Sequence, residues 1–233
     1  MARSRMRTPM VIGVDACASG WVVVGCTDGL YDVRVHATFE RVLAANPGAR
    51  CIAVDMPVGF LSRGWRAADD AARSYLRGSG RTSSVFAAPP RLALSAPTHE
   101  RACALTKKHC GKGITKQSFA LFPKIREVDR HVDDTRIIEV HPEICFRALA
   151  GPHVAIASKH TWAGVMTRRA LLTKAGIQLP ASFVGDHEVG VDDVLDAAVV
   201  TWTAQRFVNK QAQSLPPMST EKDACGRTLR IVV

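Results

Sequence analysis

Five acidic residues stand where their carboxylates could act together on a hard cation: Asp15, Asp55, Glu139, Asp193 and Asp196. The first two each close a short apolar run rich in β-branched residues, over 10–15 and 51–55, which is typical of a core strand. Acids are costly inside a fold unless they are paired or bound to a metal. Because Mg²⁺ and Mn²⁺ prefer oxygen ligands, the pattern favours a site for one of these ions.

Each acid also has a simpler interpretation. Asp15 or Asp55 alone could cap a loop, and Glu139 could be an exposed acid on an edge strand, since strand phase is hard to read over five residues. Asp193 and Asp196 share one helix face, where acids also complement the helix dipole. Two strand-end carboxylates side by side repel each other unless one is protonated or a cation lies between them, which favours the metal site.

The chain is strongly basic. Its 233 residues carry a net charge of +10, which favours a polyanionic partner, nucleic acid first, over a basic surface without a ligand. The segment 101–130 is rich in Lys and Arg, and the loop 78–91 adds two arginines. Such cations beside small residues suit phosphate binding, although a solvated charged face has the same composition. The candidate phosphate contacts are Arg81, Arg91, Lys107, Lys108, Lys112, Lys116, Lys124 and Lys159.

Composition and cysteine spacing favour a folded protein of the cytoplasm. Hydrophobic residues make up 47% of the chain, enough for a large core. The seven cysteines form no C-x-x-C pair, which favours a reducing compartment and excludes a zinc ribbon. No stretch approaches the roughly 18 apolar residues of a membrane helix. The oligomeric state stays open, a homodimer included.

The elements that must position the acids follow from hydrophobic periodicity. We expect an antiparallel meander of three strands over 10–15, 20–27 and 30–37, with the first two joined by a turn at 16–20. After a helix over 39–45, a fourth strand over 50–55 should lie parallel to the first, followed by a fifth over 136–140. The ligand site of such a sheet lies at its switch point, between strands one and four.

The remaining segments are helical or irregular. We predict one domain over 1–233, with a helical insertion over about 56–135 that includes helices at 66–76 and 98–109. Further helices are expected over 142–150, 161–175 and 191–209, then a loop over 210–222 and an edge strand over 228–233.

Together these features resemble the ribonuclease H-like superfamily and, more narrowly, the domain-of-unknown-function family 429, whose members are described as predicted RNase H-like nucleases. The resemblance rests on seven blocks in one order: Gly13–Asp15 with Gly20–Trp21, Ala53–Gly59, Ser83–Arg91, Lys124–Asp129, Glu139–Glu143, Ser158–Lys159 and Asp192–Ala197. It implies an α/β fold with the meander, two parallel strands and flanking helices, and a metal site at the switch point.

The prediction is therefore a divalent-metal-dependent nuclease. Asp15 would bridge two metal ions that the other four acids hold, and the ions would activate a water. Two alternatives remain. One is a non-enzymatic nucleic-acid-binding or regulatory protein on the same fold. The other is an actin-like sugar kinase or ATPase, because such proteins also begin with a meander and the pattern that Gly13–Asp15 shows here.

Overall fold

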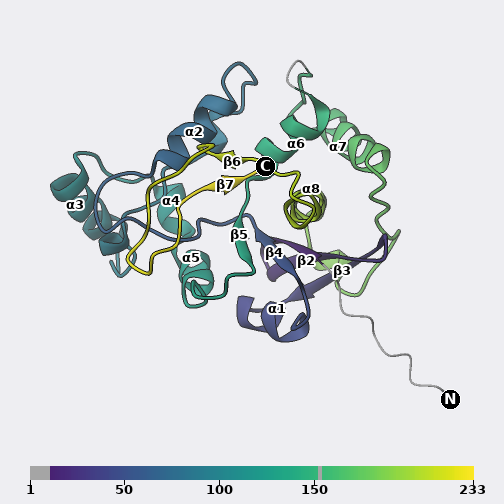
Figure 1. The fold of residues 1–233 in the computed structure, drawn as a ribbon, viewed down its shortest axis with the longest axis horizontal. Helices are drawn as coiled ribbons and strands as arrows, with labels where there is room; N and C mark the ends of the chain where they lie inside the picture. The colour runs from purple at the N-terminus through teal and green to yellow at the C-terminus, as the bar shows by residue number, and fades with distance from the viewer. Residues whose placement is uncertain (1–10, 152–153) are drawn as a thin grey trace.

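A five-stranded mixed sheet forms the centre of an α/β fold in the computed structural model, which describes residues 11–151 and 154–233 (Figure 1). Its strand order is β3-β2-β1-β4-β5. The first three strands pair antiparallel, whereas β4 runs parallel to both β1 and β5, which confirms the predicted meander and parallel pair. The strands are β1 (Val11–Cys17), β2 (Gly20–Thr27), β3 (Leu30–His36), β4 (Cys51–Val54) and β5 (Ile137–Glu139).

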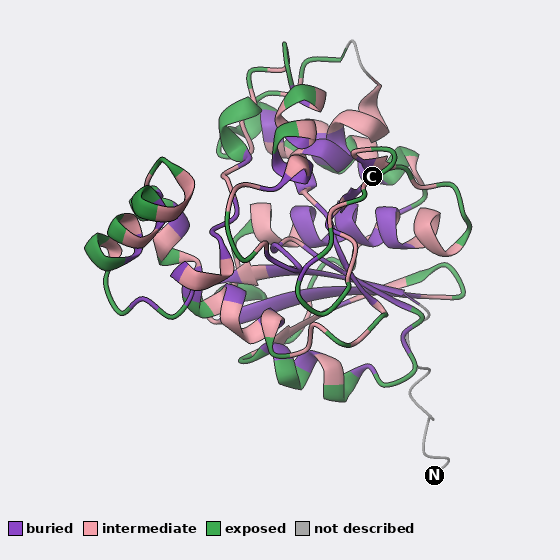
Figure 2. Cartoon of the chain, turned by 60° about the vertical axis from the view of Figure 1, so that its left-hand side comes forward, coloured by how far each residue is buried: buried purple, intermediate pink, exposed green. Residues whose placement is uncertain are grey.

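Helices cover both faces of this sheet. Helix α1 (Phe39–Ala45) lies against one face and α8 (Val191–Val208) against the other (Figure 1). The side chains of β1 alternate between them: Ile12 packs in the core on the α1 side, and Val11 packs in the core under α8. Figure 2 shows the strands and the middle of α8 as the most buried layers of the molecule.

The connection from β4 to β5 is helical, as expected. It carries α2 (Ala67–Tyr75), α3 (His99–Cys110), α4 (Lys116–Ala120), α5 (Phe122–Asp129) and two 3₁₀ turns, Thr82–Ser84 and Arg91–Ala93. Threonine side chains cap the N-termini of α3 and α4, which explains where these helices begin. Figures 1 and 2 both show α3 projecting from the rest of the molecule.

The C-terminal part adds two more helices against α8 and a small second sheet. Helices α6 (Pro142–Ala150) and α7 (Trp162–Lys174) pack on α8 (Figure 1). The second sheet pairs β6 (Ser214–Leu215) with β7 (Ile231–Val232), and a 3₁₀ turn over Asp186–Glu188 precedes α8. No helix in the described ranges has the length and apolar character that crossing a bilayer requires.

Three boundaries differ from the sequence-based expectations. Ala16 and Cys17 extend β1 rather than forming a turn, because they pair with Trp21 and Gly20 of β2. Residue 10, expected to open this strand, lies outside the described residues. The edge strand expected over 228–233 is only two residues long, and it pairs with a strand inside the expected loop 210–222. This pairing buries Leu215 and Ile231 against α2, which a polar segment alone does not reveal.

Gly13 sets the closeness of α8 to the sheet. A Cβ added at Gly13 would overlap the carbonyl oxygen of Ala197 and the backbone nitrogen of Thr201. The Thr201 hydroxyl also donates to the carbonyl of Val24 at 2.9 Å, so helix and sheet are joined here by a direct hydrogen bond. The first turns of α8 are thereby held over the C-terminal ends of β1 and β4.

We therefore expect Gly13→Ala to lower the free energy of unfolding by about 3 kcal/mol or more, because backbone atoms of α8 must move to admit the methyl group. Urea unfolding followed by circular dichroism measures this loss. Gly29→Asn is the matched control: Gly29 lies in a turn with a positive φ that asparagine tolerates, and nothing lies within 4 Å of its added Cβ. Equal stability of the Gly13→Ala variant and the native protein would contradict this packing argument.

Candidate functional site

The strand register places two of the acids side by side. Val14 of β1 pairs with Val54 of β4, and the backbone N–H of Asp55 donates to the carbonyl of Val14 at 3.0 Å. Asp15 and Asp55 thus follow neighbouring positions of parallel strands and lie at the switch point of the sheet. Strand alternation turns Asp15 toward α8, on the same face as Gly13.

The first two turns of α8 bring Asp193 and Asp196 over the same point. Asp15, Asp55 and Asp193 line one cavity of about 200 Å³. The negative charges of Asp55, Asp196 and Asp193 all raise the pKa of Asp15, so the four carboxylates act on one another. We call these four residues the acid cluster.

The acid cluster is poorly supplied with hydrogen-bond donors. Asp15 is 6% exposed and accepts one bond, from the backbone N–H of Ala16 at 2.8 Å. Asp196 is 3% exposed, and its buried Oδ1 has no hydrogen-bond partner among the described residues. A buried carboxylate oxygen without a donor is costly, so this geometry is suited to a positively charged ligand.

Burial and mutual repulsion both favour protonation of the acid cluster. Burial, then the charge of Asp55, raises the pKa of Asp15 well above its ordinary value of 3.8. Burial likewise raises the pKa of Asp55 to about 7, partly offset by Lys159. The pKa of Asp196 also rises to about 7, again through burial and against the effect of Lys159. At neutral pH the cluster therefore holds protons that a bound cation would displace.

Lys159 supplies the cation that contacts the cluster. Its Nζ donates to Asp196 Oδ2 at 2.6 Å and lies 3.4 Å from Asp192 Oδ2. Burial alone would lower the pKa of Lys159, but the charges of Asp196 and Asp15 outweigh that effect and raise it, so the ammonium stays charged. One lysine thus opposes four carboxylates.

The backbone before Lys159 is fixed against α7. Gly164 lies so close to the carbonyl of Ser158 that a Cβ there would overlap it. The buried guanidinium of Arg168 donates to the carbonyl of Ala157 at 2.8 Å and to Glu143 Oε1 at 2.6 Å. These contacts join the segment before Lys159 to both α6 and α7, so the backbone that positions the Lys159 side chain is fixed.

Glu139, the fifth expected ligand, lines the same cavity as Asp15 and Asp55, and its charge adds to the effect of burial on the pKa of Asp55, but its own carboxylate is paired with an arginine. Both of its oxygens accept from the guanidinium of Arg66 at 2.7 Å, and Oε2 also accepts the backbone N–H of Val58 at 2.7 Å. The guanidinium of Arg66 also donates to Asp69 Oδ1 at 2.6 Å, and Asp69 Oδ2 accepts the backbone N–H of Ala88. Strand phase explains this pairing. Ile137 and Ile138 pack in the cores on opposite faces of the sheet, and by alternation Glu139 shares the face of Ile137, which is the α1 side.

Of the expected phosphate contacts, Lys159 is the one that lines the cavity of the acid cluster. Lys124 lies over the ring of Trp21 at 4.7 Å. Arg91 makes a two-point ion pair with Asp129, and Arg81 donates to the carbonyl of Ile156. The other four belong to α3, α4 and the turn between them: Lys107, Lys108, Lys112 and Lys116.

Three further residues near the acid cluster were not predicted as site residues, although two of them stand in the block Glu139–Glu143. Arg66 precedes a helix and Glu143 lies in the first turn of another, where charged residues are common. His141 lines the cavity with its Nε2 3.3 Å from the carbonyl of Ser84, and its buried Nδ1 has no partner within the described part of the chain. Burial lowers the pKa of His141, so its ring is neutral at pH 7 and can accept a proton or a hydrogen bond.

The carboxylates of the acid cluster are not arranged as a metal coordination shell in this structure. Across residues 11–151 and 154–233, no three His, Cys, Asp or Glu side chains converge closely enough to hold a metal ion as they stand. The carboxylates that could hold one after side-chain rotation are Asp15, Asp55, Asp193 and Asp196, because they surround the cavity or bear an unpartnered oxygen facing the group.

Titration of Asp55 predicts a measurable pH dependence. Its folded-state pKa of about 7 lies above the ordinary 3.8, so the folded protein holds this proton more tightly than the unfolded chain. That contribution to stability is complete below pH 3.8 and is lost as the pH rises through 7. Because asparagine does not titrate, Asp55→Asn should gain about 1–3 kcal/mol of unfolding free energy relative to the native protein between pH 5 and pH 8.

Urea unfolding at the two pH values measures this difference. Asp70→Asn serves as the control, because Asp70 is 74% exposed on α2 and should show no comparable gain between the two pH values. Native and Asp55→Asn curves that stay parallel across this range would contradict the crowding of the acid cluster.

Comparison with known proteins gives one match. The model of the family DUF429, described as a protein of unknown function, matches residues 13–221. No curated protein and no solved structure matches the chain. The match spans β1 to the segment after β6 and therefore includes all four members of the acid cluster and Lys159.

Proposed function

The chain belongs to the DUF429 family, whose function is unknown, and we propose that it is a divalent-metal-dependent nuclease with a ribonuclease H-like fold. The strand order β3-β2-β1-β4-β5, with β2 antiparallel to its neighbours, supports the fold assignment. The observation that carries the function is the buried acid cluster at the switch point of this sheet, opposed by one lysine.

The residues present fit a hard cation. Three of the four carboxylates line one cavity, and the fourth, Asp196, acts on Asp15 and has a buried Oδ1 without a donor among the described residues. Mg²⁺ or Mn²⁺ takes such oxygen ligands, and its charge would relieve the repulsion that raises the pKa values of Asp15 and Asp196. Since Lys159 occupies Asp196 Oδ2, it has to withdraw before the cluster closes on an ion.

When bound, the metal supplies an activated water and charge stabilisation for the leaving oxygen of a phosphodiester. Asp15 lies between the strand end and α8 and is suited to hold the ion from the centre, with Asp55 and the two helix acids at the sides. Once displaced, Lys159 is within reach of a substrate phosphate. Glu139 would serve as a fifth ligand only after its pair with Arg66 opens, and while that pair holds it fixes the segment around Val58.

A second candidate is a non-enzymatic nucleic-acid-binding or regulatory protein on the same fold. The 2.6 Å ion pair between Lys159 and Asp196 favours it, because a cluster neutralised by its own lysine needs no metal. The two candidates differ in what they require of Asp15: the nuclease needs its charge, and the binder does not.

In the nuclease, Asp15→Asn should abolish Mg²⁺- or Mn²⁺-dependent cleavage, by at least about 100-fold, because the amide keeps the shape but loses the charge that holds the ion. The measurement is cleavage of single-stranded, duplex, hybrid and branched substrates, with metal and with EDTA. Asp32→Asn is the control, since Asp32 lies on β3 at the surface and pairs with Arg34. Residual cleavage that is equal in the native protein and Asp15→Asn would point to a contaminating nuclease and favour the binder.

Competition between Lys159 and the metal gives a test that needs no substrate. Lys159→Gln should lower the melting temperature at pH 8 without metal, because Asp196 loses its ion-pair partner. The rise in melting temperature on adding Mn²⁺ should then exceed that of the native protein, since no lysine has to leave the cluster. Lys174→Gln, at the exposed end of α7, is the control and should leave both values unchanged. Equal Mn²⁺ shifts in Lys159→Gln and the native protein would show that the two cations do not compete.

A further inference from the structure

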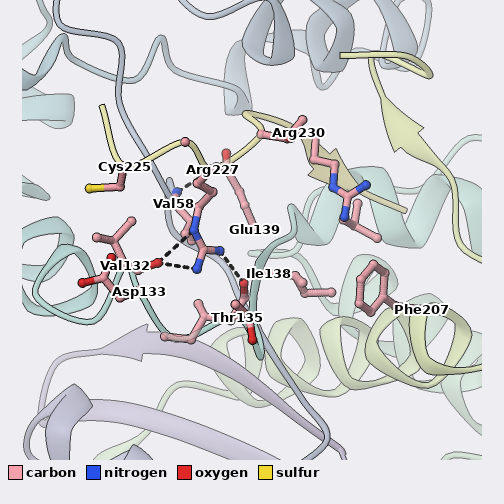
Figure 3. A pocket seen from close by; sticks show the side chains of 14 residues that line it. Val58, Val132, Asp133, Thr135, Ile138, Glu139, Phe207, Cys225, Arg227 and Arg230 are labelled. Carbon is pink, nitrogen blue, oxygen red and sulfur yellow. Dashed lines mark hydrogen bonds between the residues drawn. The ribbon is translucent and has the colours of Figure 1, made fainter. Parts of the chain in front are cut away.

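A second hollow, distinct from the cavity of the acid cluster, lies between β5 and the C-terminal segment. It has a volume of about 360 Å³ (Figure 3). Arg227 and Arg230 stand on opposite walls of it, and the guanidinium of Arg230 lies 5.8 Å from the centre of the Phe207 ring. The hollow is thus lined by two arginines and a half-buried aromatic ring.

Backbone carbonyls, rather than an acid, hold the guanidinium of Arg227 in place. Its guanidinium donates to the carbonyls of Val132, Asp134 and Ile137, as the dashed lines in Figure 3 partly show. Carbonyl oxygens orient a guanidinium without cancelling its full positive charge. Arg227 therefore presents a fixed cation on the wall of this hollow.

The hollow continues past Arg230 into a neighbouring one of about 530 Å³. Arg230, Phe207 and Val232 line both hollows, and Arg50 and Lys210 line the second. Arg50 lies just before β4 and Lys210 just after α8, so residues far apart in sequence converge here. We call the two connected hollows the basic groove.

Positive charge dominates the basic groove. Among the described residues, none of its four cations, Arg50, Lys210, Arg227 and Arg230, forms an ion pair. Two acids line it: Asp133 at one end, and Glu139, which Arg66 already neutralises. No acid lines the part that contains Arg50 and Lys210.

We propose that the basic groove binds a single strand of nucleic acid, with its phosphates on the four cations and a base on the Phe207 ring. A row of cations beside a half-buried aromatic ring suits single-strand binding, because phosphates give affinity and every base has a face that stacks. The site shares its ligand class with the proposed nuclease but does not depend on cleavage.

The aromatic end of the basic groove is remote from the helix acids of the acid cluster, whereas its other end borders the acid-cluster cavity at Glu139. Phe207 is in the last turn of α8 and Asp193 in the first, so about 20 Å of helix separates them. Among the described residues, no member of the acid cluster lines either hollow of the groove. Binding there is therefore measurable by itself, in EDTA and with Asp15→Asn.

Fluorescence anisotropy of a labelled single-stranded oligonucleotide in EDTA tests this surface. The double variant Arg50→Gln/Lys210→Gln should weaken binding about 10-fold or more at low salt and reduce the slope of log K against log salt by about 1.4, for two lost phosphate contacts. Both residues are exposed, so the fold should be unchanged by circular dichroism. Phe207→Leu should weaken binding without changing the salt slope, because stacking releases no counterions.

Arg169→Gln/Lys174→Gln is the matched control, since it removes the same charge from the exposed face of α7. The proposal is overturned if both double variants weaken binding equally, or if duplex of the same sequence binds as tightly as the single strand. Competition by pyrophosphate at the affinity of the oligonucleotide would also overturn it, because a phosphate group alone would then be recognised. Loss of cleavage with intact oligonucleotide binding would count against the nuclease and leave the groove standing.

Discussion

Repulsion among the buried carboxylates at the end of β1 and β4 is the constraint on which the rest of this structure depends. Asp15 and Asp196 are almost fully buried, and the ammonium group of Lys159 contacts Asp196 and acts on Asp15 through its charge. Burial and crowding both disfavour the charged forms, as the raised pKa values of these acids show. Such a group persists in a fold only when surrounding packing holds it together, and proteins tolerate that cost chiefly at functional sites.

The surrounding packing that holds the acids together is specific. Gly13 lets α8 approach β1 so closely that its first turns face the strand ends. Gly164 and Arg168 fix the segment that carries Lys159, and the pair of Arg66 with Glu139 fixes the segment after β4. The two glycines lack side chains where backbone atoms meet, and the two arginines are buried with all or part of their charge compensated. Each supports the acid cluster without belonging to it.

Much of this arrangement could be predicted from the sequence. The apolar runs that end in Asp15 and Asp55 predict β1 and β4, and the helix between β3 and β4 predicts that β1 and β4 are parallel. The proximity of Asp15 and Asp55 could therefore be predicted from topology. The phase of Glu139 could not be predicted, because β5 has only three residues and alternation over so short a strand is ambiguous. The partners of Lys124 and Arg91 depend on how the helices between β4 and β5 fold back on the sheet, which local patterns do not encode.

The basic groove was missed for a related reason. Its cations come from three separate segments, and none of them stands in a run of like charges. The lysine-rich segment 101–130, in contrast, is conspicuous in the sequence, yet its lysines lie on α3, α4, α5 and the turn between α3 and α4, and none of them lines the cavity of the acid cluster. Charge density along the chain therefore does not show which cations lie beside the acids, because proximity in the fold is set by the sheet and not by sequence distance.

Helix α8 joins the two charged regions, and its dipole explains only part of their arrangement. Acids near the N-terminus and cations near the C-terminus of a helix are favourable, by about 0.3–1 kcal/mol each. That effect accounts for Asp192 and Arg206, which lie in the first and last turns. It does not account for Asp196, which lies beyond the first turn, is buried and leaves one oxygen without a donor. Nor does it account for Arg50 and Arg230, which belong to other elements. Asp196, Arg50 and Arg230 therefore need an explanation other than the helix dipole, and a ligand at each of the two charged regions supplies one.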